Sequence, residues 1–64
     1  MDETLEYLMK KIEERRIDIE RSLGDGAAKD YAQYQYSVGN IQGLLTAKFL
    51  IQDLAKRQLE GDDE

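Results

Sequence analysis

The 64-residue chain contains no cysteine, histidine, proline or tryptophan. The lack of cysteine excludes a disulfide, and without cysteine or histidine the usual structural zinc site is also missing. The lack of proline leaves a long helix uninterrupted. A chain this short buries only about 60% of the surface that its unfolded form exposes. Helix packing and oligomerisation are therefore the remaining sources of stability.

Groups that carry catalysis are also scarce. An enzyme needs a nucleophile, an acid or base, or a metal held in a concave site. The serine and threonine residues after Thr4 are Ser22, Ser37 and Thr46, and none has a plausible base beside it. Two helices also offer no cleft of the roughly 300 Å³ or more that small-molecule sites occupy. We therefore expect no catalytic residues, no cofactor, no metal site and no small-molecule substrate.

The charge balance argues against two classes of partner. Fourteen acidic residues against nine basic ones give a net charge of -5 and a pI near 4.6, which disfavours nucleic acids and anionic membranes. The longest apolar stretch, residues 44–54, is interrupted by Lys48 and Asp53 and is shorter than the roughly 18 residues of a membrane span. Asp2 and Glu3 after Met1 are unlike a signal peptide. We expect a soluble protein of a reducing compartment.

A first helix is predicted over about residues 3–23. Its apolar residues recur at intervals of three, four and seven, which is typical of one buried helical face: Leu5, Leu8, Met9, Ile12, Ile19 and Leu23. Asp2 or Thr4 suits the N-cap. Gly24-Asp25-Gly26 then marks a turn, with Gly24 in the left-handed position after the helix and Asp25 capping the next helix.

A second helix is predicted over about residues 27–59, where two apolar stripes are visible. The first stripe has helical spacing and is expected to pack on the first helix: Tyr31, Tyr34, Val38, Ile41, Leu45 and Phe49. Folding back at the turn sets Ile12 near Ile41 and Leu5 near Phe49. The sequence therefore predicts an all-α fold, a single antiparallel two-helix hairpin domain over residues 1–64, with residues 60–64 as a frayed acidic tail.

The second stripe, Leu44, Ala47, Ile51 and Leu54, points to another side of the same helix, where the first helix is not expected to reach it. Monomers avoid contiguous apolar patches of this kind. Gly39 and Gly43 form a smooth strip where another backbone can approach. We therefore predict assembly into an oligomeric helical bundle. The predicted protein interface consists of Tyr36, Gly39, Gly43, Leu44, Ala47, Leu50, Ile51 and Leu54.

Two segments, A-K-D-Y-A-Q-Y at residues 28–34 and G-N-I-Q-G-L at residues 39–44, resemble small acidic helical proteins of tailed bacteriophages. These proteins share a first helix ending in S-L, here Ser22-Leu23, and a short glycine-containing loop. The resemblance covers roughly residues 8 to 60 and consists of packing residues, and functions in this family are mostly unassigned. It implies a phage origin and a virion or host-cytoplasm location. The expected function is that of a non-catalytic structural or assembly component that binds itself and a larger phage protein.

Two other functions remain open at this point. The net charge of -5 suggests an acidic inhibitor of a host enzyme, although the acids are spread among bases rather than aligned on one face. A nucleic-acid-binding hairpin would use Lys10, Lys11, Arg15 and Arg16. Glu13 and Glu14 are interleaved with these bases and weaken that case.

Overall fold

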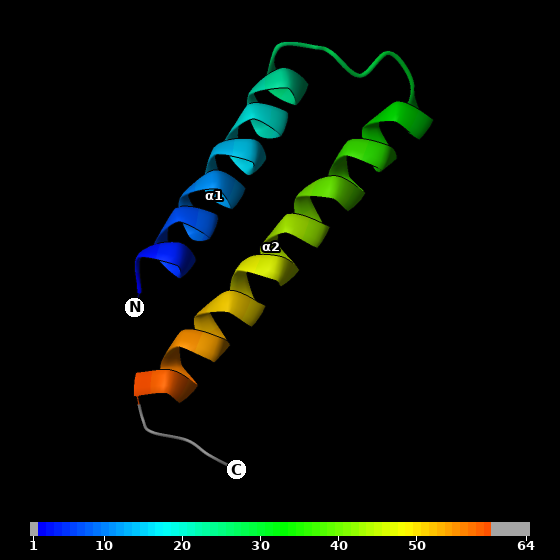
Figure 1. Ribbon diagram of the computed structural model, residues 1–64. Helices are drawn as coiled ribbons and strands as arrows, with labels where there is room; N and C mark the ends of the chain where they lie inside the picture. The colour runs from blue at the N-terminus through cyan, green and yellow to red at the C-terminus, as the bar shows by residue number, and fades with distance from the viewer. Residues whose placement is uncertain (1, 60–64) are drawn as a thin grey trace.

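The computed structural model describes residues 2–59 and contains two helices. Helix α1 spans Glu3–Gly24 and helix α2 spans Tyr31–Leu59. They pack against each other in opposite directions, joined by residues 25–30 (Figure 1). This confirms the predicted all-helical hairpin and the bounds of the first helix to within one residue. The predicted start of the second helix at residue 27 is wrong by four residues, and the predicted acidic tail, residues 60–64, lies outside the described residues.

The ends of α1 are set by side-chain and backbone caps. Asp2 confirms its expected role, because its Oδ1 accepts a hydrogen bond from the Leu5 backbone N–H at 2.8 Å. At the other end, the Asp25 N–H donates to the Arg21 carbonyl at 2.9 Å. Gly24 is still helical, and Gly26 is the residue in the left-handed region, with φ of 83°. The expectation for Gly24 was therefore wrong by two positions.

A capping box starts α2. Asp30 Oδ1 accepts from the Gln33 N–H at 2.8 Å, and Gln33 Oε1 accepts from the Lys29 N–H at 2.9 Å. This reciprocal pattern satisfies backbone donors that a helix start leaves open. Asp25, which was predicted to cap this helix, caps the end of α1 instead. The connection between the helices is therefore longer than predicted.

The least exposed residues of each helix recur at alternating intervals of four and three, the spacing of helices that pack side by side. In α1 they are Leu5, Met9, Ile12, Arg16, Ile19 and Leu23. In α2 they are Ser37, Ile41, Leu44, Lys48, Ile51 and Ala55, and the half-buried residues Val38, Leu45 and Ala47 lie along the two edges of this row. Among the described residues only α1 is available to cover α2, so these two rows face each other. We call them the seam.

The seam corrects the predicted packing of α2. Tyr31 and Phe49 are 73% and 66% exposed, and Tyr34 is exposed as well. Leu44 and Ile51, which were placed beyond the reach of the first helix, lie in the seam instead. The predicted stripe was the more apolar of the two, whereas the real seam contains Ser37 and Lys48. Counting apolar residues therefore selected a face that is only partly right: Val38, Ile41 and Leu45 of the predicted stripe are half-buried, whereas its three aromatic residues are exposed.

The register of the two helices also differs from the prediction. Lys48 Nζ lies 2.6 Å from Glu13 Oε2, and this contact defines the position of α2 along α1. The predicted neighbour of this part of α1 was Ile41, opposite Ile12. Residues of α2 therefore lie at least one helical turn from their predicted partners, because the connection uses residues 25–30 rather than the tighter turn around Gly24-Asp25-Gly26.

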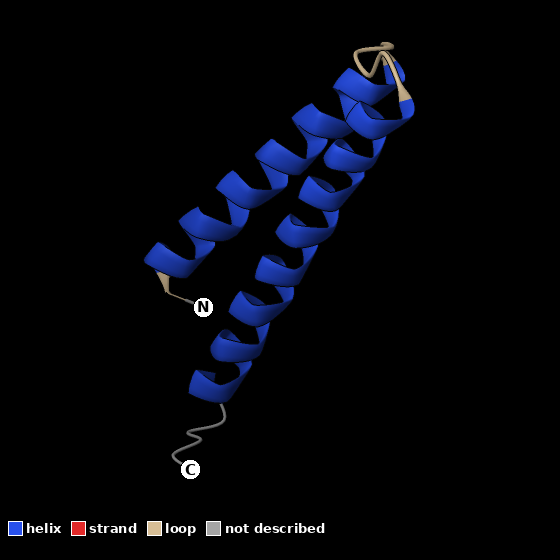
Figure 2. Ribbon diagram, turned by 90° about the vertical axis from the view of Figure 1, so that its right-hand side faces the viewer, coloured by secondary structure: helices blue, strands red, loops and turns tan. Residues whose placement is uncertain are grey.

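The hairpin is a single layer with very little core. Only Leu5 and Ala55 are buried, at 9% and 5% exposure, and no described side chain is fully enclosed. The radius of gyration is 15.0 Å, whereas a compact domain of this length has about 11 Å. Figures 1 and 2 both show α2 continuing past the start of α1. Domains usually bury their core between two layers, so one side of each helix lacks a neighbour.

Candidate protein-interaction surface on α2

Helix α2 carries apolar residues on both sides of the seam. Successive residues turn by about 100° around a helix, which places the apolar and small residues outside the seam in two rows, most of them exposed and Val38, Leu45 and Ala47 half-buried. The aromatic ridge consists of Tyr31, Tyr34, Val38, Leu45 and Phe49. The glycine ridge, on the other side, consists of Ala32, Tyr36, Gly39, Gly43, Ala47, Leu50 and Leu54. The side facing away from α1, between the two ridges, is polar and includes Gln35, Gln42, Thr46 and Asp53.

The structure divides the eight predicted interface residues into two groups. Leu44 and Ile51 belong to the seam, where α1 covers part of their surface. The other six lie on the glycine ridge. Tyr36, Leu50 and Leu54 are 74%, 66% and 45% exposed, so the large side chains of this ridge are open to a partner. Contact of these six residues with another chain stays a prediction.

The two glycines of this ridge are not used by the hairpin. A Cβ atom built on Gly39 or Gly43 would meet nothing within 4 Å. Glycine inside a helix costs about 1 kcal/mol relative to alanine. The hairpin therefore bears that cost at two positions without a close backbone contact in return, and the open strip between Tyr36 and Leu50 leaves room for one.

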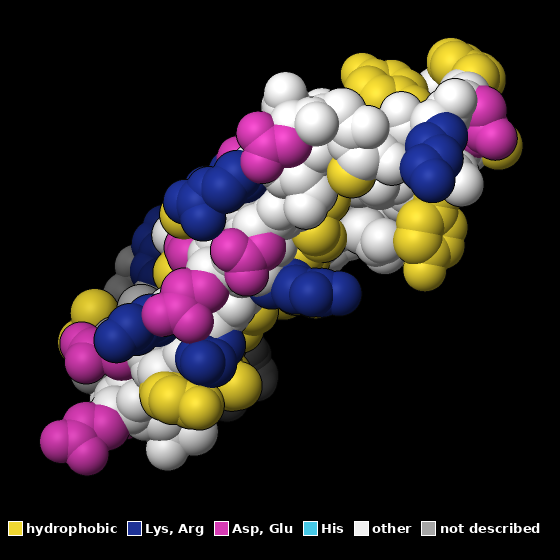
Figure 3. All heavy atoms as spheres, turned by 90° about the horizontal axis from the view of Figure 1, so that it is seen from above, with side chains coloured by type: hydrophobic (Ala, Val, Ile, Leu, Met, Phe, Trp, Pro, Cys, Tyr) yellow, Lys and Arg dark blue, Asp and Glu magenta, His cyan; other side chains and the backbone are white. Residues whose placement is uncertain are grey.

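Charge is distributed unevenly between the two helices. Residues 31–47 contain no charged side chain, whereas eleven of the 22 residues of α1 are charged. Figure 3 shows most of the acidic and basic side chains of this face close together over one part of the molecule, with hydrophobic side chains at the surface at both ends of the view. The first part of α2 therefore presents an uncharged surface, which is typical of the centre of a protein interface.

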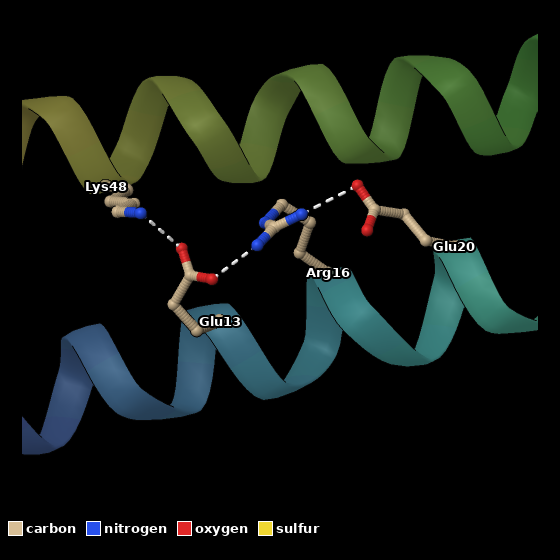
Figure 4. A network of polar contacts seen from close by, with 4 residues as sticks. All are labelled: Glu13, Arg16, Glu20 and Lys48. Atoms are coloured by element: carbon tan, nitrogen blue, oxygen red, sulfur yellow. Dashed lines mark hydrogen bonds and ion pairs between the residues drawn. The ribbon is translucent and has the colours of Figure 1, made fainter.

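A cluster of charged side chains lies between the two helices (Figure 4), and by helical position it is on the side of the seam next to the aromatic ridge. The Glu13 carboxylate accepts from Arg16 Nη2 at 2.5 Å, and Lys48 reaches it from α2. Arg16 Nη1 donates to Glu20 at 2.7 Å. The Lys48 ammonium is not aligned as a hydrogen bond, but its 2.6 Å distance from Glu13 Oε2 makes the two a close ion pair.

This cluster shifts the pKa values of Glu13 and Arg16. The hydrogen bond from Arg16, followed by the close Lys48 ammonium, lowers the pKa of Glu13 from 4.5 to about 2. The same carboxylate, followed by Glu20, raises the pKa of Arg16. A polar group in a helix seam commonly specifies register at a cost in stability. As the interhelical contact of the cluster, the Glu13–Lys48 pair is placed to select the observed register.

An open depression of about 270 Å³ lies between the helices, on the side of the seam next to the glycine ridge. Its lining residues are Arg15, Asp18, Ile19, Ser22, Ser37 and Asn40. The predicted absence concerned a cleft of roughly 300 Å³ or more, and none of these lining residues was among the predicted site residues. The signal that marks the α2 side is the pair Ser37 and Asn40, two small polar residues of which Ser37 lies in the seam and Asn40 is exposed beside it.

Residues 2–59 contain no group of three or more acidic side chains placed to hold a metal ion. Neither helix of the described chain has an apolar stretch long enough to cross a bilayer. No family model, curated protein or solved structure matches the chain. The uncovered apolar surface of α2 is accordingly the feature on which a functional proposal rests.

Proposed function

We propose that this chain is a non-catalytic small bacteriophage protein, an oligomeric structural or assembly component that binds protein partners through α2. One observation carries the proposal. All five aromatic residues are exposed, and only two residues of the hairpin are buried. Monomeric proteins rarely leave large apolar patches uncovered, so a protein partner on the ridges of α2 is the natural cover.

The phage assignment is supported by the resemblance of residues 28–34 and 39–44 to small helical phage proteins. In the hairpin, these segments form the capping box that starts α2 and the middle of the glycine ridge. Residues that recur for packing reasons therefore lie where α2 is capped and where its surface is uncovered. That placement fits a role in assembly.

The charge distribution favours this role over the acidic inhibitor. Residues 2–59 contain ten acidic and nine basic residues, so the hairpin has a net charge of only -1. The other four acidic residues, at positions 60–64, account for most of the net charge of the whole chain. A mimic of nucleic acid would need a strongly acidic face, whereas the hairpin is almost neutral and α2 is apolar.

Mass spectrometry of purified particles tests this proposal. Both mature particles and assembly precursors are purified from the phage that encodes the chain. Its peptides are expected in one or both preparations, at a ratio to the major structural proteins that stays constant through purification. Absence from both preparations would contradict the proposal. Salt-sensitive binding to a single host enzyme would instead support the inhibitor.

A pair of variants links incorporation to α2. Leu50→Glu adds a negative charge to the glycine ridge, and Gln42→Glu adds the same charge to the polar side of the same helix. Burying an unpaired carboxylate in an apolar contact is costly. Incorporation is therefore expected to fall strongly for Leu50→Glu and to stay near the wild-type level for Gln42→Glu. Equal incorporation of the two variants would show that the glycine ridge is not the binding surface.

A further inference from the structure

We propose that the occupant of the glycine ridge is a second copy of this chain, lying antiparallel along α2 about a two-fold axis near residue 41. The inference rests on the proposed function and adds the partner, the face and the direction. A two-fold interface uses the same patch on both subunits, so the patch must complement itself. Three properties of the glycine ridge meet that requirement.

The first property is the order of large and small residues. In an antiparallel pair centred near residue 41, Gly39 lies opposite Gly43 of the second copy. Tyr36 then meets the region of Ala47, and Leu50 meets Ala32. Each exposed large side chain faces a small one, and the backbones can approach at the two glycines, whose Cβ positions are open. In a parallel pair Tyr36 would meet Tyr36 and Leu50 would meet Leu50.

The second property is charge. Charged residues flank the ridge at both ends, with Asp25 and Lys29 before it and Asp53 and Arg57 near its end. The antiparallel alignment brings the end of α2 that carries Asp53 and Arg57, which pair with each other at 3.0 Å, toward the connection of the second copy, which carries Asp25 and Lys29. A parallel alignment would place each charge against its own kind. Complementary charges suppress the wrong arrangement and fix the register of an interface.

The third property is the available area. The chain exposes 4968 Å², whereas a compact monomer of 7.4 kDa exposes about 4200 Å². The difference is of the same order as the roughly 800 Å² that each partner contributes to a stable interface. The aromatic ridge is less suited to this contact, because an antiparallel pair would set Tyr31 against Phe49, and both are large. Close approach of two helices therefore favours the glycine ridge.

Disulfide trapping tests the arrangement directly, because the natural chain has no cysteine. Tyr36→Cys and Ala47→Cys chains, distinguished by a mass tag, are mixed and oxidised. A disulfide forms only when the two Cα atoms lie within about 7 Å. The mixed product is expected to exceed either homodimer at least tenfold. Tyr31→Cys and Phe49→Cys chains provide the matched control on the aromatic ridge and should show no such excess.

Other outcomes would overturn the inference in distinguishable ways. Predominant homodimers of each variant would indicate a parallel pair. A mixed product that prevails at Tyr31 and Phe49 would move the contact to the aromatic ridge, and in both cases the proposed function would survive. A chain that is monomeric at every concentration would overturn both, and a trapped dimer that is absent from particles would overturn only the proposed function.

A second measurement covers the case in which a cysteine variant does not fold. Sedimentation equilibrium of Leu50→Glu should show a dissociation constant at least tenfold above that of the wild type. Gln42→Glu should leave the dissociation constant unchanged. Equal affinity of Leu50→Glu and the wild type would overturn the proposed face.

Discussion

Replacing Gly39 and Gly43 together by alanine should have opposite effects on the hairpin and on its dimer. In the hairpin neither new methyl group meets an atom within 4 Å. Each substitution therefore gains the helix propensity of alanine, about 1 kcal/mol, and the pair gains about 2 kcal/mol. For a domain of this size, that gain raises the midpoint of thermal unfolding by about 10 °C.

The dimer should respond in the other direction. At the proposed two-fold contact Gly39 faces Gly43 of the second copy, so the two substitutions add four methyl groups where the backbones meet. The helices must then move apart and lose contacts at Tyr36 and Leu50. We expect the dissociation constant to rise at least about tenfold, which corresponds to about 1.4 kcal/mol.

Thermal unfolding followed by circular dichroism over a wide range of protein concentrations separates the two effects. The wild-type midpoint should rise with concentration, because association stabilises the folded chain. The double variant should have the higher midpoint in dilute solution and a weaker dependence on concentration. Gln42→Ala, on the polar side of α2, serves as the control and should leave that dependence as in the wild type.

Two results would contradict these expectations for Gly39 and Gly43. An unchanged concentration dependence in the double variant would show that the glycines lie outside the dimer contact. A lower midpoint in dilute solution would show that Gly39 and Gly43 face something inside the hairpin, contrary to the open Cβ positions.

Three further predictions concern the hairpin itself. Ile51→Ala should lower the free energy of unfolding of the monomer by about 1–2 kcal/mol, and Phe49→Ala should lower it by less than about 0.5 kcal/mol, as measured by urea denaturation. A larger loss for Phe49→Ala would show that Phe49 packs on α1, as the sequence had predicted. Asp30→Ala should cost about 1 kcal/mol, through loss of the cap, and more than Asp25→Ala in the same assay. The pKa of Glu13 is held at about 2, below its ordinary 4.5, so the stabilising contribution of this carboxylate is present above pH 4.5 and is lost as the pH falls toward 2. Thermal unfolding measured over this pH range should show the loss in the wild type and a smaller loss in Glu13→Gln.

The sequence was sufficient to predict the hairpin because α1 has a single apolar face. Its seam residues Leu5, Ile12 and Ile19 stand out against a heavily charged background, and Asp2 is a strong N-cap. The start of α2 was also readable, since Asp30 and Gln33 have the spacing of a capping box. The two glycines of the turn suggested a tighter connection, and the cap of α2 was therefore predicted at Asp25 instead.

The face of α2 could not be chosen from periodicity, because apolar residues surround much of this helix. The real seam includes Lys48 and Ser37, which an apolar template rejects. What places Lys48 there is its ion pair with Glu13, a contact between distant parts of the chain that local spacing does not reveal. For the same reason Leu44 and Ile51 were predicted to lie on the interaction surface, although they lie in the seam.

The residues that share the glycine ridge could be predicted from sequence, but their exposure could not. Tyr36, Leu50 and Leu54 have helical spacing and lie beside Gly39 and Gly43, so their common side was readable from sequence alone. Their exposure depended on which stripe α1 covers, and that required the three-dimensional register. The polar depression near Ser37 and Asn40 depends on the same register and was missed.

Sedimentation equilibrium of the wild-type chain shows whether α1 covers one side of α2 and another chain covers the rest. We expect a reversible dimer, or a larger assembly with an even number of chains, at tens of micromolar, dissociating to a folded or partly folded monomer on dilution. A single monomeric species throughout that range, with the helical content of the hairpin intact, would contradict it.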